Sequence, residues 1–370
     1  MCSSDLPLVG WKHRPGAHGW AQQCVDDAPE WRSYTRINDH GLRDRDVPYA
    51  RTAAFRILVL GDSFTEGMQV DEDATFPKRL EATLAAGGQP GLEVINAGMS
   101  AWATDNELLF FLDEGWKYRP DVVLLAFDTM NDVLENQRAL LGRTGFYPDK
   151  PYFAFDDGRL TLRHFPLPLL PRRRRIGMRL DAELFLRSAL FRRLAELPSI
   201  ALRLQLPAPR PLLPGPPPEI LDAYRRTYPP VWQEAWRITR GLVLRLRRAV
   251  EDRGAHLVVV IVNPREEVAR RRWQAALALP VLQGQAVDVD KPNRLITRFL
   301  ARRGIPAIPL LDEFRAHVDD DGKPAFFDWD IHWTAAGHDL AARVIAARLR
   351  DLGLVPGTTT RSSTVGAGAP

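Results

Sequence analysis

The sequence has little cysteine and none of the motifs that hold a metal ion or a nucleotide. It contains two cysteines, Cys2 and Cys24, which do not define a disulfide framework. The eight histidines are scattered without the spacing of metal ligands. There is no His-Glu-x-x-His, no Cys-x-x-Cys and no Gly-x-Gly-x-x-Gly after a strand. We therefore expect neither a cofactor nor a bound metal.

Long apolar segments are also missing. No run of about 18 apolar residues occurs, so the sequence predicts no transmembrane helix. Residues 1–6 have neither the charged n-region nor the apolar h-region of a signal peptide. This start fits a cytoplasmic protein, and it equally fits an extracytoplasmic protein with a truncated N-terminus, so the compartment stays open.

The chain carries a basic excess without the pattern of a nucleic-acid binder. Its formal net charge is +4, and the excess lies in arginine-rich pieces such as 171–175 and 270–272. Neither piece is interleaved with the aromatic side chains that stack on bases. We expect no nucleic-acid partner, whereas a solvated face or contact with a membrane surface remains open. The oligomeric state is not indicated.

What is present is a set of apolar runs that each end in a small polar turn. Residues 56–60 form the first run, and Gly61-Asp-Ser-Phe-Thr-Glu66 follows it. A serine at the carboxyl end of a strand, just before a helix, lies where open α/β sheets bind their ligands. Ser63 is therefore a candidate nucleophile. A phosphate-binding turn or a plain connection between strand and helix is the alternative.

Three more blocks follow later apolar runs. Asn96-Ala-Gly98 comes after residues 92–95, and Asp128-Thr-Met-Asn-Asp132 comes after 121–127. Near the end, Asp328-Trp-Asp-Ile-His-Trp333 leads into a helix. This order resembles the SGNH (GDSL-type) hydrolase family, over roughly residues 33–140 and 255–350. In this resemblance the four naming residues are Ser63, Gly98, Asn131 and His332.

The resemblance implies a catalytic triad and an oxyanion hole. Ser63 would be the nucleophile, His332 its general base, and Asp330 the residue that orients the imidazole. The oxyanion would be bound by the Ser63 N–H, the Gly98 N–H and the side-chain amide of Asn131. Each residue type suits its role, since a hydroxyl forms an acyl intermediate and imidazole titrates near neutral pH.

Two positions depart from the family pattern. The family's aspartate stands three residues before the histidine, where this chain has Trp329. Its Asp330-x-His-Trp form resembles the subgroup that includes alginate O-acetyltransferases, with Asp328 as a weaker candidate for the orienting acid. The family expects Gly-x-Asn-Asp where this chain has Thr129-Met-Asn-Asp132. The Thr129 side chain could narrow the oxyanion side or tilt Asn131.

Several polar and aromatic residues near these blocks have simpler interpretations. We expect Asp62 to tie its turn together through its carboxylate and Asp132 to be structural. Glu66 is predicted to be an ordinary exposed acid at the start of a helix, and His338 a surface residue or a residue behind the site. Two tryptophans beside the blocks could stack on a sugar ring, although core packing explains them as well. These tryptophans are Trp102 and Trp333.

The pattern of runs predicts an α/β fold. Strands are expected at about 56–60, 92–96, 121–127, 256–262 and 306–310, and helices near 74–87, 104–118, 219–253, 266–279 and 334–351. Strands separated by helical patterns predict a parallel sheet with helices on both faces, a three-layer flavodoxin-like arrangement. The strand order would be 2-1-3-4-5, which puts Ser63 and Asn131 at the switch point.

The chain divides into an N-terminal arm, a catalytic domain and a tail. Residues 1–53 are predicted to form an extended arm, 54–353 the catalytic domain, and 354–370 a disordered tail. An insertion at 140–218 interrupts the domain. It contains a predicted β-hairpin at 151–163, an amphipathic helix near 181–196 and a proline-rich stretch, and its role as a lid or a connector is open.

Three classes of function follow, in decreasing order of preference. The first is a serine esterase that cleaves short-chain acyl or acetyl esters of a carbohydrate or lipid. The second is an O-acyltransferase that passes the same acyl group to a glycan hydroxyl. The third is a non-catalytic protein that binds a glycan or lipid, and Thr129 at the expected glycine is its best support.

Overall fold

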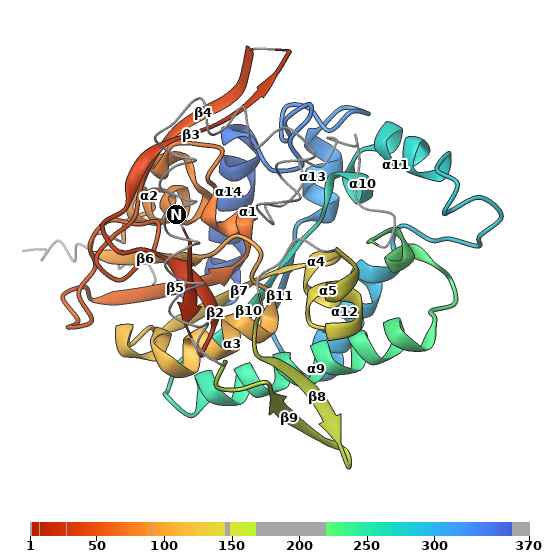
Figure 1. The fold of residues 1–370 in the computed structure, drawn as a ribbon. Coiled ribbons are helices and arrows are strands. Elements are labelled where there is room, and N and C mark those ends of the chain that lie inside the picture. The colour runs from red at the N-terminus through yellow and green to blue at the C-terminus, as the bar shows by residue number, and fades with distance from the viewer. Residues whose placement is uncertain are drawn as a thin grey trace, which may run out of the picture.

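The centre of the molecule is a five-stranded parallel sheet (Figure 1). This computed structural model describes residues 2–6, 8–26, 28–89, 91–144, 149–167 and 220–356. The strand order is β11-β10-β7-β5-β6, which is the predicted 2-1-3-4-5 order read from the other edge. The strands are β5 (Phe55–Gly61), β6 (Leu92–Gly98), β7 (Val122–Asp128), β10 (His256–Val262) and β11 (Ala307–Pro309).

Successive side chains of these strands enter two different cores. In β5, Leu58 and Leu60 face one core, whereas Ile57 and Val59 face the other. Because both faces are covered, the strands are continuously apolar rather than alternating. The helices of the first face are α3 (Thr104–Asp113), α9 (Pro230–Glu251) and α12 (Lys291–Arg302). Those of the second are α2 (Phe76–Ala86), α13 (Leu311–His317) and α14 (Ala335–Asp351). The predicted three-layer α/β fold is confirmed.

Three of the predicted helices are shorter or divided. The first is α3, which ends before Gly115 and is followed by η2 (Gly115–Tyr118). In the second, η3 (Ile220–Tyr224) is separate from α9, which starts at Pro230, as proline in the first turn of a helix allows. The third consists of α10 (Arg265–Val268) and α11 (Arg270–Leu277), with the extended residue Ala269 between them. Neither α12 nor α13 was predicted from the sequence.

The N-terminal residues form two antiparallel pairs of strands. The first pair is β1 (Cys2–Leu6) and β2 (Gly10–His13), and the second is β3 (His18–Val25) and β4 (Ala28–Arg36). The second pair is a hairpin that rises at the top of Figure 1, above α2 and α14. Its residues alternate between an exposed face and a face that is more buried.

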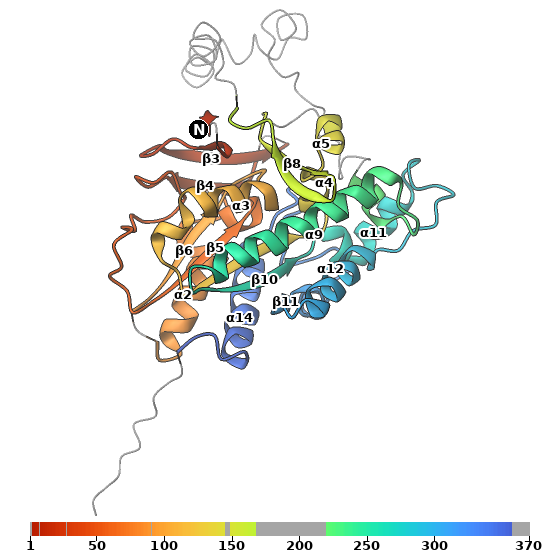
Figure 2. The same ribbon diagram turned by 90° about the horizontal axis from the view of Figure 1, so that it is seen from below.

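The part of the insertion that the structure describes includes the predicted hairpin. It is made of β8 (Tyr152–Asp156) and β9 (Arg159–Arg163), which pair antiparallel. The hairpin lies on α9, as Figure 2 shows. Gly241 of α9 permits this approach, because a Cβ there would lie 3.1 Å from Cδ2 of Leu160. The predicted helix near 181–196, the proline-rich stretch and residues 357–370 of the tail lie outside the described residues.

No helix in the described part of the chain has the combined length and apolar character that crossing a membrane needs.

Candidate active site

Ser63 lies at the carboxyl end of β5, as the first residue of the short helix α1 (Ser63–Glu66). The Asp62 carboxylate caps this helix by accepting the Phe64 N–H at 2.9 Å, so its predicted role in the turn is confirmed. Gly61 is required before it, since a Cβ there would lie 2.1 Å from Oγ1 of Thr65. The helix ends at Gly67, whose φ is +65°. Ser63 itself stays partly exposed, where a substrate can reach it.

The structure brings His332 and Asp330 to this serine. The Ser63 Oγ lies 2.7 Å from Nε2 of His332. On the other side of the ring, Nδ1 lies 2.5 Å from Oδ1 of Asp330, which also accepts the His332 backbone N–H at 2.9 Å. Asp328 is directed elsewhere and pairs with Lys323 at 2.6 Å. Of the two candidate acids, Asp330 is therefore the one in contact with the imidazole.

The charges around the imidazole favour its protonated form. Burial alone would lower the pKa of His332, but the hydrogen-bonded Asp330 raises it above its usual value, with help from Asp62 and Glu66. Burial would raise the pKa of Asp330, but hydrogen bonds from His332 and from the Trp31 indole hold it below its usual range. An ionised carboxylate thus faces a ring that accepts a proton readily, as a general base requires.

Gln69 is a neighbour of His332 that the sequence analysis did not identify. Its amide nitrogen Nε2 lies 2.9 Å from the same Nδ1, while its oxygen Oε1 is buried without a partner. When Nδ1 carries the proton that it donates to Asp330, Nδ1 has no lone pair with which to accept an N–H of Gln69. A turn of the amide by 180° places the acceptor Oε1 beside Nδ1–H, and such turns are assigned from the hydrogen bonds around the amide.

Glu66 is not the exposed acid that the sequence predicted. It is fully buried behind Ser63, where it pairs with His13 and accepts the N–H of Ser100 at 2.6 Å and the hydroxyl of the same residue. Burial would raise the pKa of Glu66, but His13 and Ser100 lower it. The prediction was wrong because these partners lie 53 and 34 residues away in the chain.

Arg43 holds the segment that follows the nucleophile. Its side chain is 1% exposed and donates to three backbone carbonyls, at 2.9 Å to Glu66, 2.7 Å to Gly67 and 2.5 Å to Val70. Together with His13, Arg43 ties the N-terminal part of the chain to the Ser63 turn.

Asn131 begins α4 (Asn131–Glu135), just after β7, and is partly exposed. Its backbone N–H donates to Asp128 at 2.8 Å, and its Nδ2 lies 3.4 Å from Oδ2 of Asp62. The Asn131 side-chain amide therefore lies beside the nucleophile turn, and its hydrogen bond to Asp62 is long and weak. The Thr129 hydroxyl donates a hydrogen bond to the carboxylate of Glu267 in α10 at 2.8 Å, so the Thr129 side chain contacts α10.

The Gly98 N–H, which the family resemblance assigns to the oxyanion hole, is already bonded. It is buried and donates to Oδ1 of Asn96 at 3.0 Å. A Cβ at Gly98 would lie 2.3 Å from the Glu66 nitrogen, so glycine here permits β6 to approach α1. Its oxyanion role stays a prediction, and this bond argues against it. Ala101, three residues on, is partly exposed with φ +65°, a conformation that clusters at active sites.

Buried carboxylates surround the turn. Burial and like charges raise the pKa of Asp62 to about 8, that of Asp132 to about 7 and that of Asp128 to about 6. Asp132 accepts the N–H of Thr104 at 2.6 Å and its hydroxyl at 2.7 Å, and so links α4 to α3. Its predicted structural role is confirmed. Within the residues described, no three histidine, cysteine, aspartate or glutamate side chains are grouped so that they could hold a metal ion.

The remaining side chains near the blocks belong to the core. Trp102 and Trp333 are 0% and 1% exposed, so core packing is the correct interpretation and stacking on a sugar is excluded for them. His338 is buried as well, and its Nδ1 accepts the Phe76 N–H at 3.1 Å. Burial lowers the pKa of His338 to about 3, and a surface position for it was wrong.

Among solved structures, similar chains carry esterase or hydrolase descriptions. A putative acylhydrolase from Bacteroides fragilis is 12% identical, with 84% of this chain and 93% of that chain covered and a TM-score of 0.40. A putative lipolytic protein of the G-D-S-L family from Desulfitobacterium hafniense is 9% identical, with 80% and 99% covered and a TM-score of 0.41. An acetylxylan esterase from Geobacillus stearothermophilus is 12% identical, with 83% and 99% covered and a TM-score of 0.40. Likeness at this level carries no argument about activity.

One protein-family model matches part of the chain, whereas no curated protein matches it. The matching family is described as the SGNH hydrolase-like domain of the acetyltransferase AlgX, and the match covers residues 227–369. This segment contains Asp330 and His332 and lies after Ser63 in the chain. Over residues 227–369 the chain is therefore similar to the SGNH hydrolase-like domain of AlgX, and the resemblance predicted from the Asp-x-His-Trp block is confirmed.

Proposed function

We propose that this chain is a serine-dependent enzyme that cleaves carboxylic esters through an acyl-enzyme, with short acyl or acetyl esters of a carbohydrate or lipid as the substrate class. The observation that carries the proposal is the continuous contact from Ser63 Oγ to His332 Nε2, at 2.7 Å, and from His332 Nδ1 to Asp330 Oδ1, at 2.5 Å. The base thus contacts the nucleophile through one ring nitrogen and the residue that orients it through the other.

The first step transfers one proton and forms one bond. Nε2 of His332 takes the proton of the Ser63 hydroxyl while Oγ attacks the ester carbonyl carbon, and the carbonyl oxygen becomes an oxyanion. Asp330 stabilises the imidazolium that results. The imidazolium then protonates the departing alkoxide, which leaves as an alcohol and gives the acyl-enzyme.

The oxyanion needs donors that are already in place. The Ser63 N–H at the start of α1 and the Asn131 amide beside Asp62 support such a site. Gly98 can contribute only if its N–H leaves Asn96, so the N–H of Ala101, on the loop after the same strand, is an alternative donor. Loss of one such donor typically costs about 3–4 kcal/mol of transition-state stabilisation.

The second step decides the class of enzyme. His332 activates an acceptor that attacks the acyl-enzyme, and this acceptor is water in a hydrolase or a sugar hydroxyl in a transferase. Hydrolysis is our first choice, because the triad alone supports it. Transfer to a glycan hydroxyl is the second candidate, because the matching family model is that of an acetyltransferase domain.

The experiment compares the full chain and Ser63→Ala on p-nitrophenyl acetate and butyrate, with and without a sugar acceptor. Serine-dependent release without the acceptor supports hydrolysis. Release that needs the acceptor and yields an acylated sugar supports transfer. Circular dichroism of Ser63→Ala checks that the fold persists. No serine-dependent release in a folded protein would overturn the proposal and favour the non-catalytic binding protein.

A further inference from the structure

The β3–β4 hairpin reaches the acid of the triad from the other end of the chain. The indole N–H of Trp31 donates to Oδ2 of Asp330 at 2.9 Å, across 299 residues. The neighbouring Glu30 accepts two backbone N–H groups of the same loop, that of Trp329 at 2.7 Å and that of Asp330 at 3.0 Å. One side chain of the hairpin therefore contacts the carboxylate of Asp330, and the next holds the backbone that carries it.

These contacts complete the hydrogen bonding of Asp330. Its Oδ1 is occupied by His332, through both the ring and the backbone N–H, and its Oδ2 accepts from Trp31. The carboxylate side chain is only 7% exposed, so little water is available to replace a missing donor. Without Trp31, one oxygen of a buried and ionised group would lose its partner, which is costly.

The loop around Asp330 has little regular structure of its own. Residues 327–334 belong to no helix or strand, although the isolated bridge between Phe326 and Trp333 closes the segment. Its backbone is held on one side by Arg265, which donates to the Asp328 carbonyl at 3.0 Å. On the other side it is held by Glu30. Its geometry therefore depends on distant parts of the chain.

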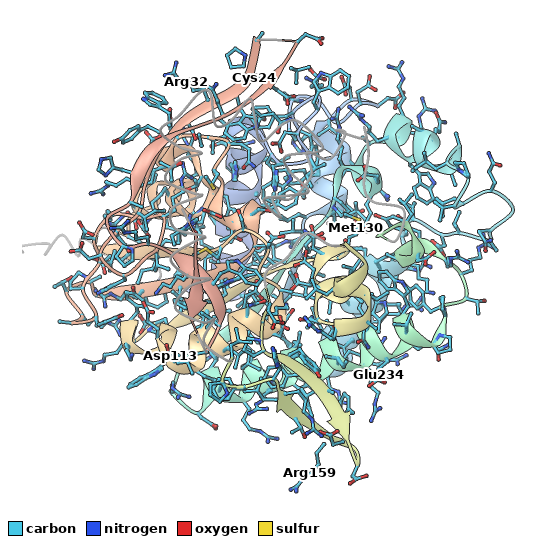
Figure 3. All side chains as sticks on the ribbon, viewed as in Figure 1. Cys24, Arg32, Asp113, Met130, Arg159 and Glu234 are labelled. Carbon is cyan, nitrogen blue, oxygen red and sulfur yellow. The ribbon has the colours of Figure 1, made fainter. Side chains whose placement is uncertain are left out.

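The hairpin also contacts the nucleophile side. The hydroxyl of Ser33 donates to the carbonyl of Met68, which lies just beyond the helix that Ser63 begins. Ser33 is fully buried, whereas Arg32 is exposed and stacks on Trp20 at 4.2 Å from its ring centre. Figure 3 shows Arg32 at the outer edge of the hairpin. The neighbours Ser33 and Arg32 thus differ, because Ser33 contacts the nucleophile side and Arg32 is exposed to solvent.

We propose that the β3–β4 hairpin is a positioning element of the catalytic base, in which Trp31 orients the Asp330 carboxylate and Glu30 fixes its backbone. The inference rests on the proposed function in that His332 acts as the base. It adds that residues 18–36 help to set the proton affinity of the base.

The other charged groups near His332 lie outside the hairpin. Its ring faces Asp330 on its own loop, Asp62 and Glu66 from the nucleophile turn, and Asp128 from the end of β7. The buried His338 of α14 interacts with it as well. Glu30 is the acid of the hairpin nearest to the loop, and it is retained when Trp31 is replaced. A change in the titration of His332 in a Trp31 variant must therefore act through Asp330.

The main experiment titrates His332 in the full chain by NMR, with ¹⁵N-labelled histidine and assignment by a His332→Gln variant. Trp31→Phe keeps an aromatic ring and removes the N–H donor. Without this donor, the negative charge of Asp330 is neutralised less by hydrogen bonds. The carboxylate should then stabilise the protonated His332 ring more strongly and raise the pKa of His332 by about half a unit. Arg32→Ala is the matched control, and it should leave the titration unchanged.

Kinetics provide the second measurement. Trp31→Phe should lower kcat on p-nitrophenyl acetate about tenfold with little change in KM, because the small ester does not need the hairpin for binding. The acid limb of kcat/KM should move to higher pH. Glu30→Ala should lower kcat as well, whereas Glu30→Gln keeps an acceptor oxygen and should restore part of it.

The outcomes separate this inference from the proposed function. An unchanged His332 titration and unchanged kcat in Trp31→Phe, with only a lower Tm, would mean that the hairpin supports the fold alone, and the inference would be wrong. An inactive wild-type chain would instead overturn the proposed function. The NMR titration needs no turnover, so it would still report whether Trp31 acts on the Asp330–His332 pair.

Discussion

The two halves of the candidate triad are held in different ways. The nucleophile turn, residues 61–67, takes its shape from its own residues, since Asp62 caps α1 at 2.9 Å and two glycines permit its tight geometry. His13 and Arg43 then hold the far side of this turn in place. The base loop, residues 327–334, is fixed by side chains almost 300 residues away, through Glu30 and Trp31. A strand followed by a helix can place a serine by local rules, whereas an irregular loop needs tertiary contacts.

This difference predicts different consequences of substitution. A change in the base loop should alter the titration of His332 and the rate, because Asp330 contacts the imidazole directly. A change behind the nucleophile turn should mainly alter stability, because Glu66 and His13 form a buried pair that supports the turn and Glu66 affects the pKa of His332 less than Asp330 does. Substitutions in the two segments test this contrast.

Asp330→Asn should lower kcat by about 10³–10⁴-fold on a small activated ester, because the imidazole loses the carboxylate that fixes its tautomer and stabilises its protonated form. The same change should lower the pKa of His332, since Asp330 is the strongest group that raises it. Steady-state kinetics over a pH series measure both effects.

Asp328→Asn is the control for this prediction. Asp328 pairs with Lys323 at 2.6 Å on the exposed part of the same loop, so its loss should change kcat very little. The reverse order of effects would move the orienting role to Asp328 and contradict the geometry of the loop.

Glu66→Ala should reduce the free energy of unfolding by about 3–5 kcal/mol, because it removes the acceptor of three buried hydrogen bonds, those from the His13 ring, the Ser100 N–H and the Ser100 hydroxyl. Glu66→Gln keeps an acceptor for Ser100 and should cost much less. Denaturant unfolding of the two variants measures the difference. Equal costs would show that the charge of Glu66 matters more than its hydrogen bonds.

Asn131→Ala should lower kcat by roughly a hundredfold or more if its amide binds the oxyanion. Its thermal stability should change little, because the side-chain amide makes a single long contact of 3.4 Å with Asp62. An unchanged kcat would remove Asn131 from the site and leave the backbone donors near Ser63 to bind the oxyanion.

The sequence was sufficient for the sheet and for the place of Ser63. Apolar runs with polar ends predicted the five strands, their order and the position of Ser63 at the carboxyl edge of the sheet. The approach of Asp330 and His332 to Ser63 was predicted from the family resemblance of their block, since the two residues lie in a loop after α13 and not at the end of a strand. Divided helices such as α10 and α11 were predicted as one, since helical spacing continues across the single extended residue Ala269.

The supporting contacts could not be predicted in the same way. Glu66 follows Ser63 at a position that is typical of an exposed helix start, and nothing near it in the sequence indicates His13. Trp31 likewise gives no local sign that its indole meets Asp330. Such pairs depend on how distant segments pack, and the residues next to Glu66 and Trp31 in the sequence do not indicate that packing.

His338 gives the smallest effect and tests the nucleophile half through pH. The ring is buried behind the turn, and its pKa is lowered to about 3 from a usual value of 6.5. Below pH 6.5 the unfolded chain binds a proton at this histidine and the folded chain does not, so stability falls as the pH falls. Between pH 7 and pH 5 the wild type should lose about 2 kcal/mol more than His338→Asn, whose side-chain oxygen can still accept the Phe76 N–H. The raised carboxyl groups nearby titrate in both proteins, so the difference between the two pH profiles isolates His338. Equal profiles would mean that the pKa of His338 is the same in the folded and unfolded chains, and the nucleophile turn would then gain a charged neighbour as the pH falls below 6.5.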